Sequence, residues 1–545
     1  MLASERTKRE LGFLDVLSRV RPRSPFGKRR MDNLMPYMPG DEARLEGELD
    51  RLERMCRVSL SHRQEWEGLA AVFHAMKDVS ATIERSSHET LSVVELYEVK
   101  ALLLQMEESR AIIAGMGDGW PSNLTPAAAD GLLDLLDPEG SRLPAFYIYD
   151  QFSEKLANLR KEKKDKELAL RREQKKLAEE AEARLGIKLS PKFDASVPRS
   201  ETEKLAAAES SPLLQVGGED FSSVTFQLRL GAEGRRLTAE ADTIGALVED
   251  EELAVRKRLS KEVAKYAPLL LKNCRVIGDA DFVMAKTDHA IRHDCVKPGV
   301  VRIHTLRLED GRYLPLERLL REKGQDYSPV SIFLDEGVSC ITGANMGGKT
   351  ISMKLAGLVA LMAQHGFFVP CKSAFVGLSS SAHILIGDSQ DMQKGLSSFG
   401  SEMEGLGEIL SKSGEKALIF IDEIAGSTNP AEGRALTKAL IGYLSKRPYI
   451  TLMTTHFERV AEGAGVVNLR VHGLSSADFD RLSAELRNAG INDRIEIITR
   501  FMDYRLERVN GGAEIPKDAL RIAEILGIKR EIIDGAREIL EAQAQ

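Results

Sequence analysis

The chain has 545 residues, of which 43% are hydrophobic, and its formal net charge is −7. This length allows about two to four domains, and the negative charge excludes a surface that is basic throughout but not a local basic groove. The five cysteines lack the C-x-x-C spacing of zinc sites, and no apolar run reaches the roughly 18 residues of a membrane span. We therefore expect a cytoplasmic protein that does not enter a membrane.

The first 150 residues are predicted to form a helical domain. Apolar residues recur every three or four positions over residues 41–57 and 91–109, which is the spacing of amphipathic helices. Residues 115–126, rich in Gly, Pro and Asn, are expected to connect helices. A basic cluster is a candidate for phosphate contacts, although a solvated loop before a helix has the same composition. It comprises Arg19, Arg21, Arg23, Lys28, Arg29 and Arg30.

Residues 151–300 are predicted to form a helical arm with a small tip. Residues 154–184 carry 11 basic and 8 acidic side chains, a net charge of +3, which is typical of a long solvated helix. We expect a loop over residues 190–211 and a strand over 222–230, where polar and apolar residues alternate. A helix over residues 243–266 is expected to return antiparallel to the first.

Residues 301–545 are predicted to form a nucleotide-binding domain, because residues 343–350 fit the phosphate-binding pattern G-x4-G-K-[ST]. An apolar strand over 338–342 leads into this loop and a helix over 351–355 leads out, a context that an ordinary Gly-rich turn lacks. Backbone N–H groups and the helix N-terminus would surround the phosphates of ATP. The predicted ATP-binding residues are Gly343, Asn345, Met346, Gly347, Gly348, Lys349 and Thr350.

Acidic residues follow at the end of a second buried strand. The apolar run 417–423 ends in Asp422 and Glu423, as a parallel strand would. Asp422 and Thr350 would bind Mg²⁺, Lys349 would reach the β- and γ-phosphates, and Glu423 would orient or deprotonate the attacking water. A third apolar strand, 449–453, precedes His456, which would either sense the γ-phosphate or serve as a polar loop residue. Glu423, His456 and Lys349 are the predicted catalytic residues of an ATPase.

Four motifs of this region carry a family resemblance. Residues 343–350 are similar to G-P-N-M-G-G-K-[ST], and residues 396–399 resemble an S-T-F signature. Residues 422–433 resemble a Walker B strand and the loop after it, and residues 455–457 are similar to T-H-[FY]. Together they resemble the MutS family of mismatch-repair ATPases, especially its MutS2-like branch. The resemblance is specific over residues 330–475, with weaker likeness at 11–28 and 517–523.

The resemblance implies an ABC-type α/β P-loop ATPase domain with a mostly parallel sheet. An all-α lever domain with a long helical arm and a small clamp tip would precede it. It also implies a homodimer with composite ATP sites and C-terminal dimerisation helices. Ser397 would then approach the nucleotide bound by the other subunit, Asn345 would contact the γ-phosphate side, and His456 would report its presence. ATP binding and hydrolysis would drive a conformational cycle.

Several departures from the family pattern point to an atypical branch. The family's mismatch-reading domain carries an F-x-E wedge, but Phe13, Phe26 and Phe73 are not followed by x-Glu. We therefore expect no mismatch reader of that kind, and we also expect no C-terminal nuclease domain. Ala344 stands where the family often has Pro, and Ser427 stands where it often has Gly.

Two functions from different classes agree with these features. In the first, the arm clamps duplex or branched DNA during repair or recombination. In the second, the chain is a remodelling ATPase that grips a protein, as some MutS-like proteins are thought to do when they reactivate B12-dependent amino-acid aminomutases. The acidic residues of the tip favour a protein client, whereas the family favours DNA. A metabolic kinase is a third reading, but nothing in the sequence resembles a small-substrate pocket.

Overall fold

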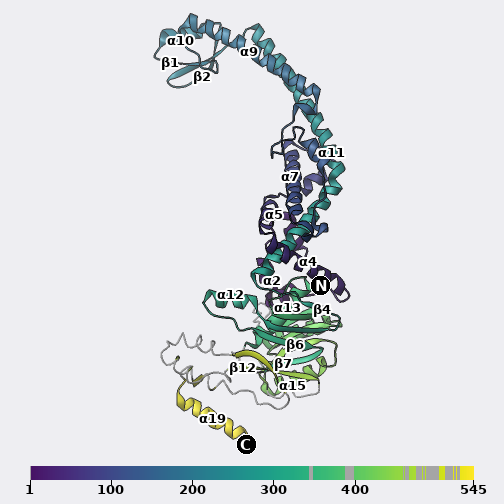
Figure 1. The fold of residues 1–545 in the computed structure, drawn as a ribbon. Helices are drawn as coiled ribbons and strands as arrows, with labels where there is room; N and C mark the ends of the chain where they lie inside the picture. Colours follow the sequence, from purple (N-terminus) through teal and green to yellow (C-terminus); the bar gives the residue numbers. More distant parts are fainter. Residues whose placement is uncertain are drawn as a thin grey trace. The chain divides into compact units, whose positions relative to one another are not determined.

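A computed structural model gives the fold of most of the chain (Figure 1). The residues that it describes are 2–342, 348–386, 398–426, 428–457, 460, 465–473, 482, 485, 503–509, 520, 523–524 and 528–544. Most of the predicted phosphate-binding loop, residues 343–347, lies outside these ranges. The same holds for Ser397 and Ser427.

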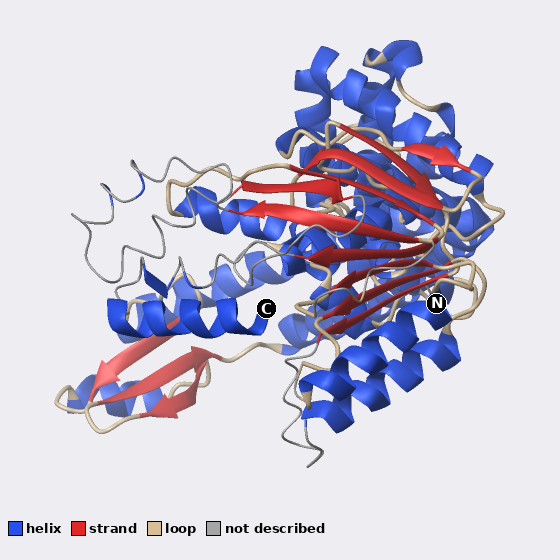
Figure 2. Cartoon of the chain, turned by 90° about the horizontal axis from the view of Figure 1, so that it is seen from below, coloured by secondary structure: helices blue, strands red, loops and turns tan. Residues whose placement is uncertain are grey.

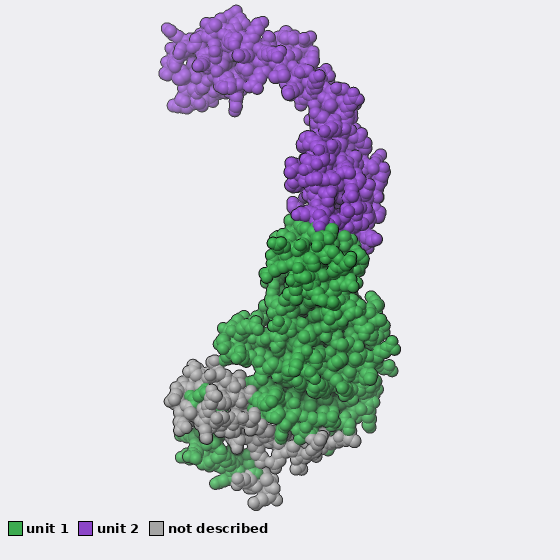
Figure 3. Space-filling view, in the orientation of Figure 1, with its two compact units in different colours: residues 1–75, 112–125, 276–545 green, residues 76–111, 126–275 purple. Residues whose placement is uncertain are grey.

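The chain divides into two compact units, shown in green and purple in Figure 3. The first unit contains residues 1–75, 112–125 and 276–545, and the second contains residues 76–111 and 126–275. The division into domains at residues 150 and 300 remains a prediction. The two long helices α7 (Val93–Gly115) and α11 (Ala232–Arg292) each contribute residues to both units.

A six-stranded sheet forms the centre of the first unit, in the order β13–β12–β7–β11–β10–β9. Four of its five strand pairs are parallel, and only β12 and β13 pair antiparallel. The predicted mostly parallel sheet is therefore present. Its strands are β7 (Gly337–Thr342), β9 (Ser381–Ile386), β10 (Ala417–Asp422), β11 (Ile450–Thr454), β12 (Val466–Gly473) and β13 (Asp503–Val509).

Helices cover both faces of this sheet, as Figure 2 shows. Alternate residues of a strand point to opposite faces, so Leu418 and Phe420 pack in the cluster that contains α13 (Lys349–Gln364). Ile419 and Ile421 pack in a second cluster with α14 (Ser398–Lys412) and α15 (Pro430–Leu444). Burial on both faces explains why β10 is an uninterrupted apolar run in the sequence.

A second, four-stranded sheet was not predicted from the sequence. It has the order β4–β8–β5–β6, and α12 (Leu314–Glu322) follows β5 in the chain. Its core residues, such as Leu306, Val330 and Val376, join the cluster around α13. The strands are β4 (Gly299–Val301), β5 (Thr305–Gly311), β6 (Val330–Asp335) and β8 (Ser373–Gly377).

The N-terminal residues pack directly on the six-stranded sheet and on α13 of the first unit. The carbonyl oxygen of Leu2 accepts a hydrogen bond from the N–H of Ala382 in β9, at 2.6 Å, and Leu11 is fully buried in the cluster around α13. A Cβ atom placed on Gly357 of α13 would lie 2.3 Å from Leu11 Cδ2, so the two segments are in close contact. This part of the chain forms α1 (Glu5–Glu10), α2 (Phe13–Arg19) and α3 (Pro25–Asp32).

Close packing of Gly377 at the end of β8 gives a first prediction. A Cβ atom at this position would lie 2.0 Å from the carbonyl oxygen of Ile303, a backbone atom beside the pairing of β4 and β8. We expect Gly377→Ala to lower the free energy of unfolding by about 1–3 kcal/mol or more, as overpacking does. Urea denaturation followed by circular dichroism measures this change.

Gly442 on α15 is the matched control, because a Cβ there would meet no atom within 4 Å. Gly442→Ala is expected to be neutral or to stabilise the helix by up to about 1 kcal/mol. Equal stability of the two variants would contradict the predicted clash.

The remaining helices confirm the helical prediction for the first 150 residues. α4 covers the first predicted amphipathic segment and α7 covers the second. Short 3-10 turns over Gly117–Gly119 and Ser122–Leu124 occupy the expected connection. The helices of this region are α4 (Glu42–Ser61), α5 (Arg63–Ala75), α6 (Ser80–Arg85) and α8 (Asp130–Leu136), in addition to α7. A further helix, α19 (Arg530–Ala544), lies near the C-terminus.

The predicted arm is a pair of antiparallel helices in the second unit. A short 3-10 turn, Asp150–Phe152, precedes α9 (Glu154–Leu185), whose N-cap is Ser153. Ion pairs join α9 to α11: Lys166 Nζ lies 2.6 Å from Glu240, and Lys155 Nζ lies 2.9 Å from Glu251. α11 is much longer than the expected segment and continues through Pro268.

The tip is a small domain with its own hydrophobic core. It contains a three-stranded antiparallel sheet in the order β1–β3–β2, and Phe226 of β3 is fully buried at its centre. The expectation of a loop over residues 190–211 is wrong, because Ala195 and Val197 pair and pack with β3 and an Ala-rich helix follows. Its elements are β1 (Asp194–Pro198), α10 (Thr202–Glu209), β2 (Leu214–Glu219) and β3 (Ser223–Leu228).

Among the residues that the structure describes, no helix is both long enough and apolar enough to cross a membrane.

Candidate nucleotide-binding site

The candidate site lies at the carboxyl ends of three neighbouring parallel strands. β7 ends at Thr342, directly before the predicted phosphate-binding loop, and α13 begins at Lys349 after it. β10 ends at Asp422 and β11 at Thr454, and these two residues are partners in the strand register. Ligands of open α/β sheets bind at this edge, so the three predicted motifs converge where a nucleotide would be bound.

Asp422 is held between two hydroxyl groups. Thr350 Oγ1 donates to Asp422 Oδ2 at 2.7 Å, and Thr454 Oγ1 donates to Asp422 Oδ1. Asp422 is 8% exposed, and Thr454 is fully buried. The structure thus brings together the two predicted metal ligands, Thr350 and Asp422. Oxygen donors of this kind suit Mg²⁺, which prefers carboxylate and hydroxyl ligands with several waters.

Lys349 and Glu423 form an ion pair at the start of α13. Lys349 Nζ lies 2.9 Å from Glu423 Oε1, and the Lys349 side chain is 3% exposed whereas that of Glu423 is 35% exposed. A buried ammonium group requires a negatively charged partner. Glu423 supplies a negative charge for the buried Lys349 ammonium group.

The backbone around Glu423 adopts an unusual conformation. Glu423 has a φ angle of 49° and Ala425 one of 58°, both in the left-handed region that residues with side chains rarely adopt. The Glu423 N–H donates to the Thr454 hydroxyl at 3.0 Å, and the Ala425 N–H donates to Glu402 Oε2 at 2.9 Å. These contacts hold the Glu423 side chain at the end of the strand, beside Lys349.

His456 lies beside the loop that follows Glu423. Its ring centroid is 4.4 Å from that of Phe457, and a Cβ atom on Gly426 would lie 3.5 Å from His456 Cε1. The imidazole is exposed, in contrast to the buried Thr455 that precedes it. His456 is thus placed at the same edge as Asp422 and Glu423.

Gly348 marks the entry to α13 and requires its glycine. Its φ angle is 73°, and a Cβ atom there would lie 2.7 Å from Tyr504 Cδ1 on β13. Burial raises the pKa of Tyr504 above its ordinary value. The ring of Tyr504 packs against Gly348, the last residue before α13, and no sequence motif indicated this contact.

The structure describes some of the predicted site residues and not others. Gly348, Lys349, Thr350, Asp422, Glu423 and His456 are described and lie at one edge of the sheet. Gly343, Asn345, Met346, Gly347 and Ser397 lie outside the described residues. Sequence reasoning missed Thr454, Glu402 and Tyr504. A Thr at the end of a strand next to the Walker B strand was the available signal for the first of these.

Three of the six residues of the basic cluster near the N-terminus pair with carboxylates of the same unit. Arg30 Nε lies 2.8 Å from Asp279, Arg19 Nε lies 3.2 Å from Asp15, and Arg23 pairs with Asp288. These pairs offset the charge that would attract phosphates. The cluster is therefore a weaker candidate for nucleic-acid contacts than its composition suggested.

Comparison with known proteins identifies the domain that carries this site. Residues 339–543 match the family MutS domain V. The protein named Endonuclease MutS2 of Lactiplantibacillus plantarum is 29% identical over 296 residues, which are 54% of this chain and 34% of that protein. Its namesake in Symbiobacterium thermophilum is 30% identical over 306 residues, which are 55% of this chain and 35% of that protein.

The similarity thus spans about a third of the length of these curated relatives. A further Endonuclease MutS2, from Pelotomaculum thermopropionicum, is 30% identical over 288 residues, or 33% of its length. MutS domain V is a P-loop ATPase domain, in agreement with the geometry at the ends of β7, β10 and β11. Residues 339–543 therefore resemble MutS domain V, and the curated relatives that the chain is similar to are named Endonuclease MutS2.

Proposed function

We propose that this chain binds and hydrolyses ATP and uses the cycle to close its helical arm on DNA. The observation that carries the ATPase part is the joint placement of Lys349, Thr350, Asp422 and Glu423 at one sheet edge. DNA as the client is supported by the family and by relatives named Endonuclease MutS2. The active form would be a homodimer with composite ATP sites, to which Ser397 of one subunit contributes.

In the first step of the proposed cycle, the Lys349 ammonium group leaves its ion pair with Glu423 and pairs with the phosphates of ATP. ATP brings negative charge to the loop before α13, so Lys349 no longer depends on Glu423 for its counter-charge. Glu423 is then free to orient and deprotonate the attacking water. Thr350 and Asp422 would hold Mg²⁺, which supplies charge neutralisation at the β- and γ-phosphate oxygens when bound. His456, near the same edge, would respond to the γ-phosphate.

Steady-state ATP hydrolysis with and without duplex or branched DNA, at low and moderate salt, tests this proposal. Stimulation by DNA that weakens as salt rises would support a clamp that contacts phosphates. Glu423→Ala is the inactive control. Hydrolysis that depends on Glu423 but is indifferent to every DNA would refute the clamp and retain the ATPase.

A protein client, such as a B12-dependent aminomutase, is the second candidate, and the tip favours it. Residues 186–231 carry five basic and six acidic side chains, which does not attract phosphates. Phe221 is fully exposed at the turn between β2 and β3. Asp220 fixes that turn by accepting from the backbone N–H groups of Ser222 and Ser223, each at 2.7 Å. A rigid exposed aromatic beside carboxylates suits an apolar protein pocket with a basic rim.

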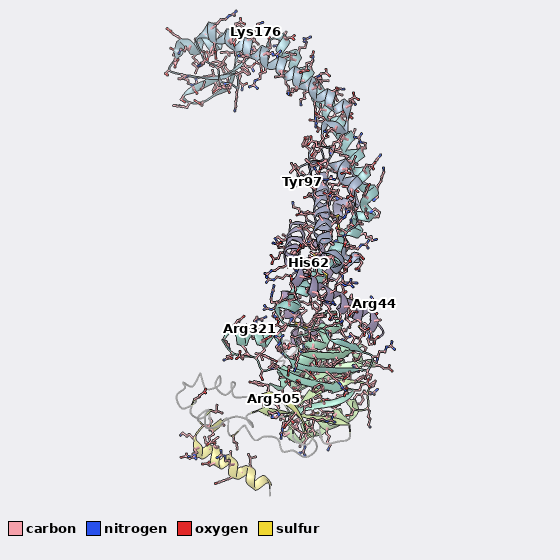
Figure 4. The ribbon with its side chains drawn as sticks, viewed as in Figure 1. Arg44, His62, Tyr97, Lys176, Arg321 and Arg505 are labelled. Carbon is pink, nitrogen blue, oxygen red and sulfur yellow. The ribbon has the colours of Figure 1, made fainter. Side chains whose placement is uncertain are left out.

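Two substitutions test how the arm and the tip would contact DNA. Lys176 is an exposed basic residue of α9, labelled in Figure 4. If the arm grips DNA, Lys176→Glu should weaken binding of a labelled duplex uniformly across sequences and reduce the salt slope by about 1. Phe221→Ala should leave that affinity unchanged. The opposite result, with loss of duplex binding only in Phe221→Ala, would mean that the tip inserts into DNA and would contradict the charge argument.

A further inference from the structure

We infer that Glu402 is a positioning residue that holds Glu423 in place for hydrolysis, an inference that rests on the proposed ATPase function. Glu402 lies in the first turns of α14 and is 5% exposed. Its Oε2 accepts a hydrogen bond from the backbone N–H of Ala425 at 2.9 Å. Glu402 therefore holds the backbone of the loop two residues beyond Glu423.

This loop needs external contacts to keep its shape. Glu423 and Ala425 both have positive φ angles, 49° and 58°, which persist only where the surroundings fix them. Thr454 fixes the first residue by accepting from the Glu423 N–H, and Glu402 fixes the second. Because a carboxylate forms a stronger hydrogen bond to an N–H group than a neutral acceptor does, Glu402 is suited to holding a strained turn.

α15 closes the opposite side of the same loop. A Cβ atom on Gly433 of α15 would lie 2.8 Å from the carbonyl oxygen of Ala425 and 2.8 Å from Phe457 Cζ. The N–H of Ala425 thus faces Glu402 while its carbonyl faces Gly433. If the Glu402 side chain is removed, the N–H of Ala425 loses its hydrogen-bond acceptor. The loop can then shift, and the Glu423 carboxylate with it, away from the position at which it would activate the attacking water.

Kinetics of Glu402 variants of the full chain test this role. We expect Glu402→Ala to lower kcat by about 10-fold to 100-fold, since a misplacement of about 1 Å costs this much. Affinity for a fluorescent ATP analogue should stay within about 3-fold, because Glu402 holds the loop at Ala425, two residues beyond Glu423. Glu402→Gln keeps an acceptor oxygen and should restore most of kcat. Glu402→Asp keeps a carboxyl group but shortens the side chain so that it no longer reaches Ala425, and should behave like the Ala variant.

A double-mutant cycle with Glu423→Gln separates this role from a structural one. If Glu402 acts through Glu423, then Glu402→Ala should cause no further loss in the Glu423→Gln background. A full additional loss there would overturn the inference, and so would a folded Glu402→Ala or Glu402→Asp variant with the kcat of the unmodified chain. Retained hydrolysis in Glu423→Gln alone would instead refute the proposed catalytic base, so the two failures are distinguishable.

Discussion

Glu423→Gln is expected to lower the rate of ATP hydrolysis by about 10²–10⁴-fold, the usual contribution of a general base. The amide keeps the shape of the side chain but cannot accept the proton of the attacking water. Binding of ATP should be retained or strengthened, because the variant replaces the carboxylate that lies 2.9 Å from Lys349 Nζ with a neutral amide, which competes less with phosphate for Lys349. Single-turnover hydrolysis and titration with a fluorescent ATP analogue measure the two effects separately.

Lys349→Met is the control for this experiment, because it should abolish binding and hydrolysis together. Among the described residues of the site, Lys349 is the only buried cation at the start of α13, so no other described residue can replace its charge there. A Glu423→Gln variant that hydrolyses ATP within about 3-fold of the unmodified chain would show that another group activates the water. Weaker ATP binding in that variant would contradict the proposed exchange of Lys349 between Glu423 and phosphate.

Lys100→Met is expected to destabilise the second unit by about 3–5 kcal/mol, because it leaves a buried carboxylate without its cation. Lys100 and Asp137 are both fully buried, and Lys100 Nζ lies 2.9 Å from Asp137 Oδ1 and 2.8 Å from the carbonyl oxygen of Ala145. Hydrogen exchange of peptides from residues 126–152 should accelerate by about 10²–10³-fold, whereas peptides from α13 should be unaffected.

The double variant Lys100→Met with Asp137→Asn tests whether the unpaired charge is the cause. An asparagine side chain at this position would be neutral and could still accept from the backbone N–H of Arg142, which donates to Asp137 at 2.8 Å. The double variant should therefore exchange more slowly than Lys100→Met alone. If it exchanges as fast or faster, the lost packing of the lysine, and not the buried charge, dominates.

Low pH should weaken the ion pair of Lys100 and Asp137 and thereby lower the stability of the second unit. Burial alone would raise the pKa of Asp137, but hydrogen bonds from Arg142 N–H and Lys100 outweigh it and hold the pKa below its ordinary value of 3.8. A carboxyl with a lowered pKa in the folded state stabilises the fold above its unfolded pKa, and this contribution is lost as pH falls through the folded value. The stability of the second unit should therefore decline below about pH 4, and Asp137→Asn should make this decline smaller.

Much of the ATPase-like domain could be predicted because its signals are local. β10 is buried on both faces and is therefore apolar throughout, and Gly348, directly before α13, has a positive φ angle of 73° that favours glycine. Burial of a strand and a positive φ angle each restrict the residue types at consecutive positions, so both can be recognised in the sequence. Lys349, Thr350, Asp422 and Glu423 could be assigned roles for the same reason, since each stands at the end of a recognisable strand or at the start of a helix.

Other features were set by contacts between residues far apart in the chain. The four-stranded sheet combines short strands from residues 299–377, and β4 has only three residues, too few for an alternation to be recognised. Residues 194–198 contain a Pro and polar residues and become a strand only because β3 offers a partner. The burial of Leu11 against Gly357 joins positions that have no periodic relation in the sequence.

The sequence by itself determined the nucleotide chemistry of this protein, because phosphate binding depends on residue types at fixed spacing within one strand, loop and helix. Tertiary structure alone decided which groups support that chemistry. Glu402 and Thr454 reach the backbone around Glu423 from other elements, and the charges of Arg19, Arg23 and Arg30 are offset by carboxylates. Side-chain hydrogen bonds and ion pairs of this kind form only when folding brings distant segments together, so composition cannot reveal them.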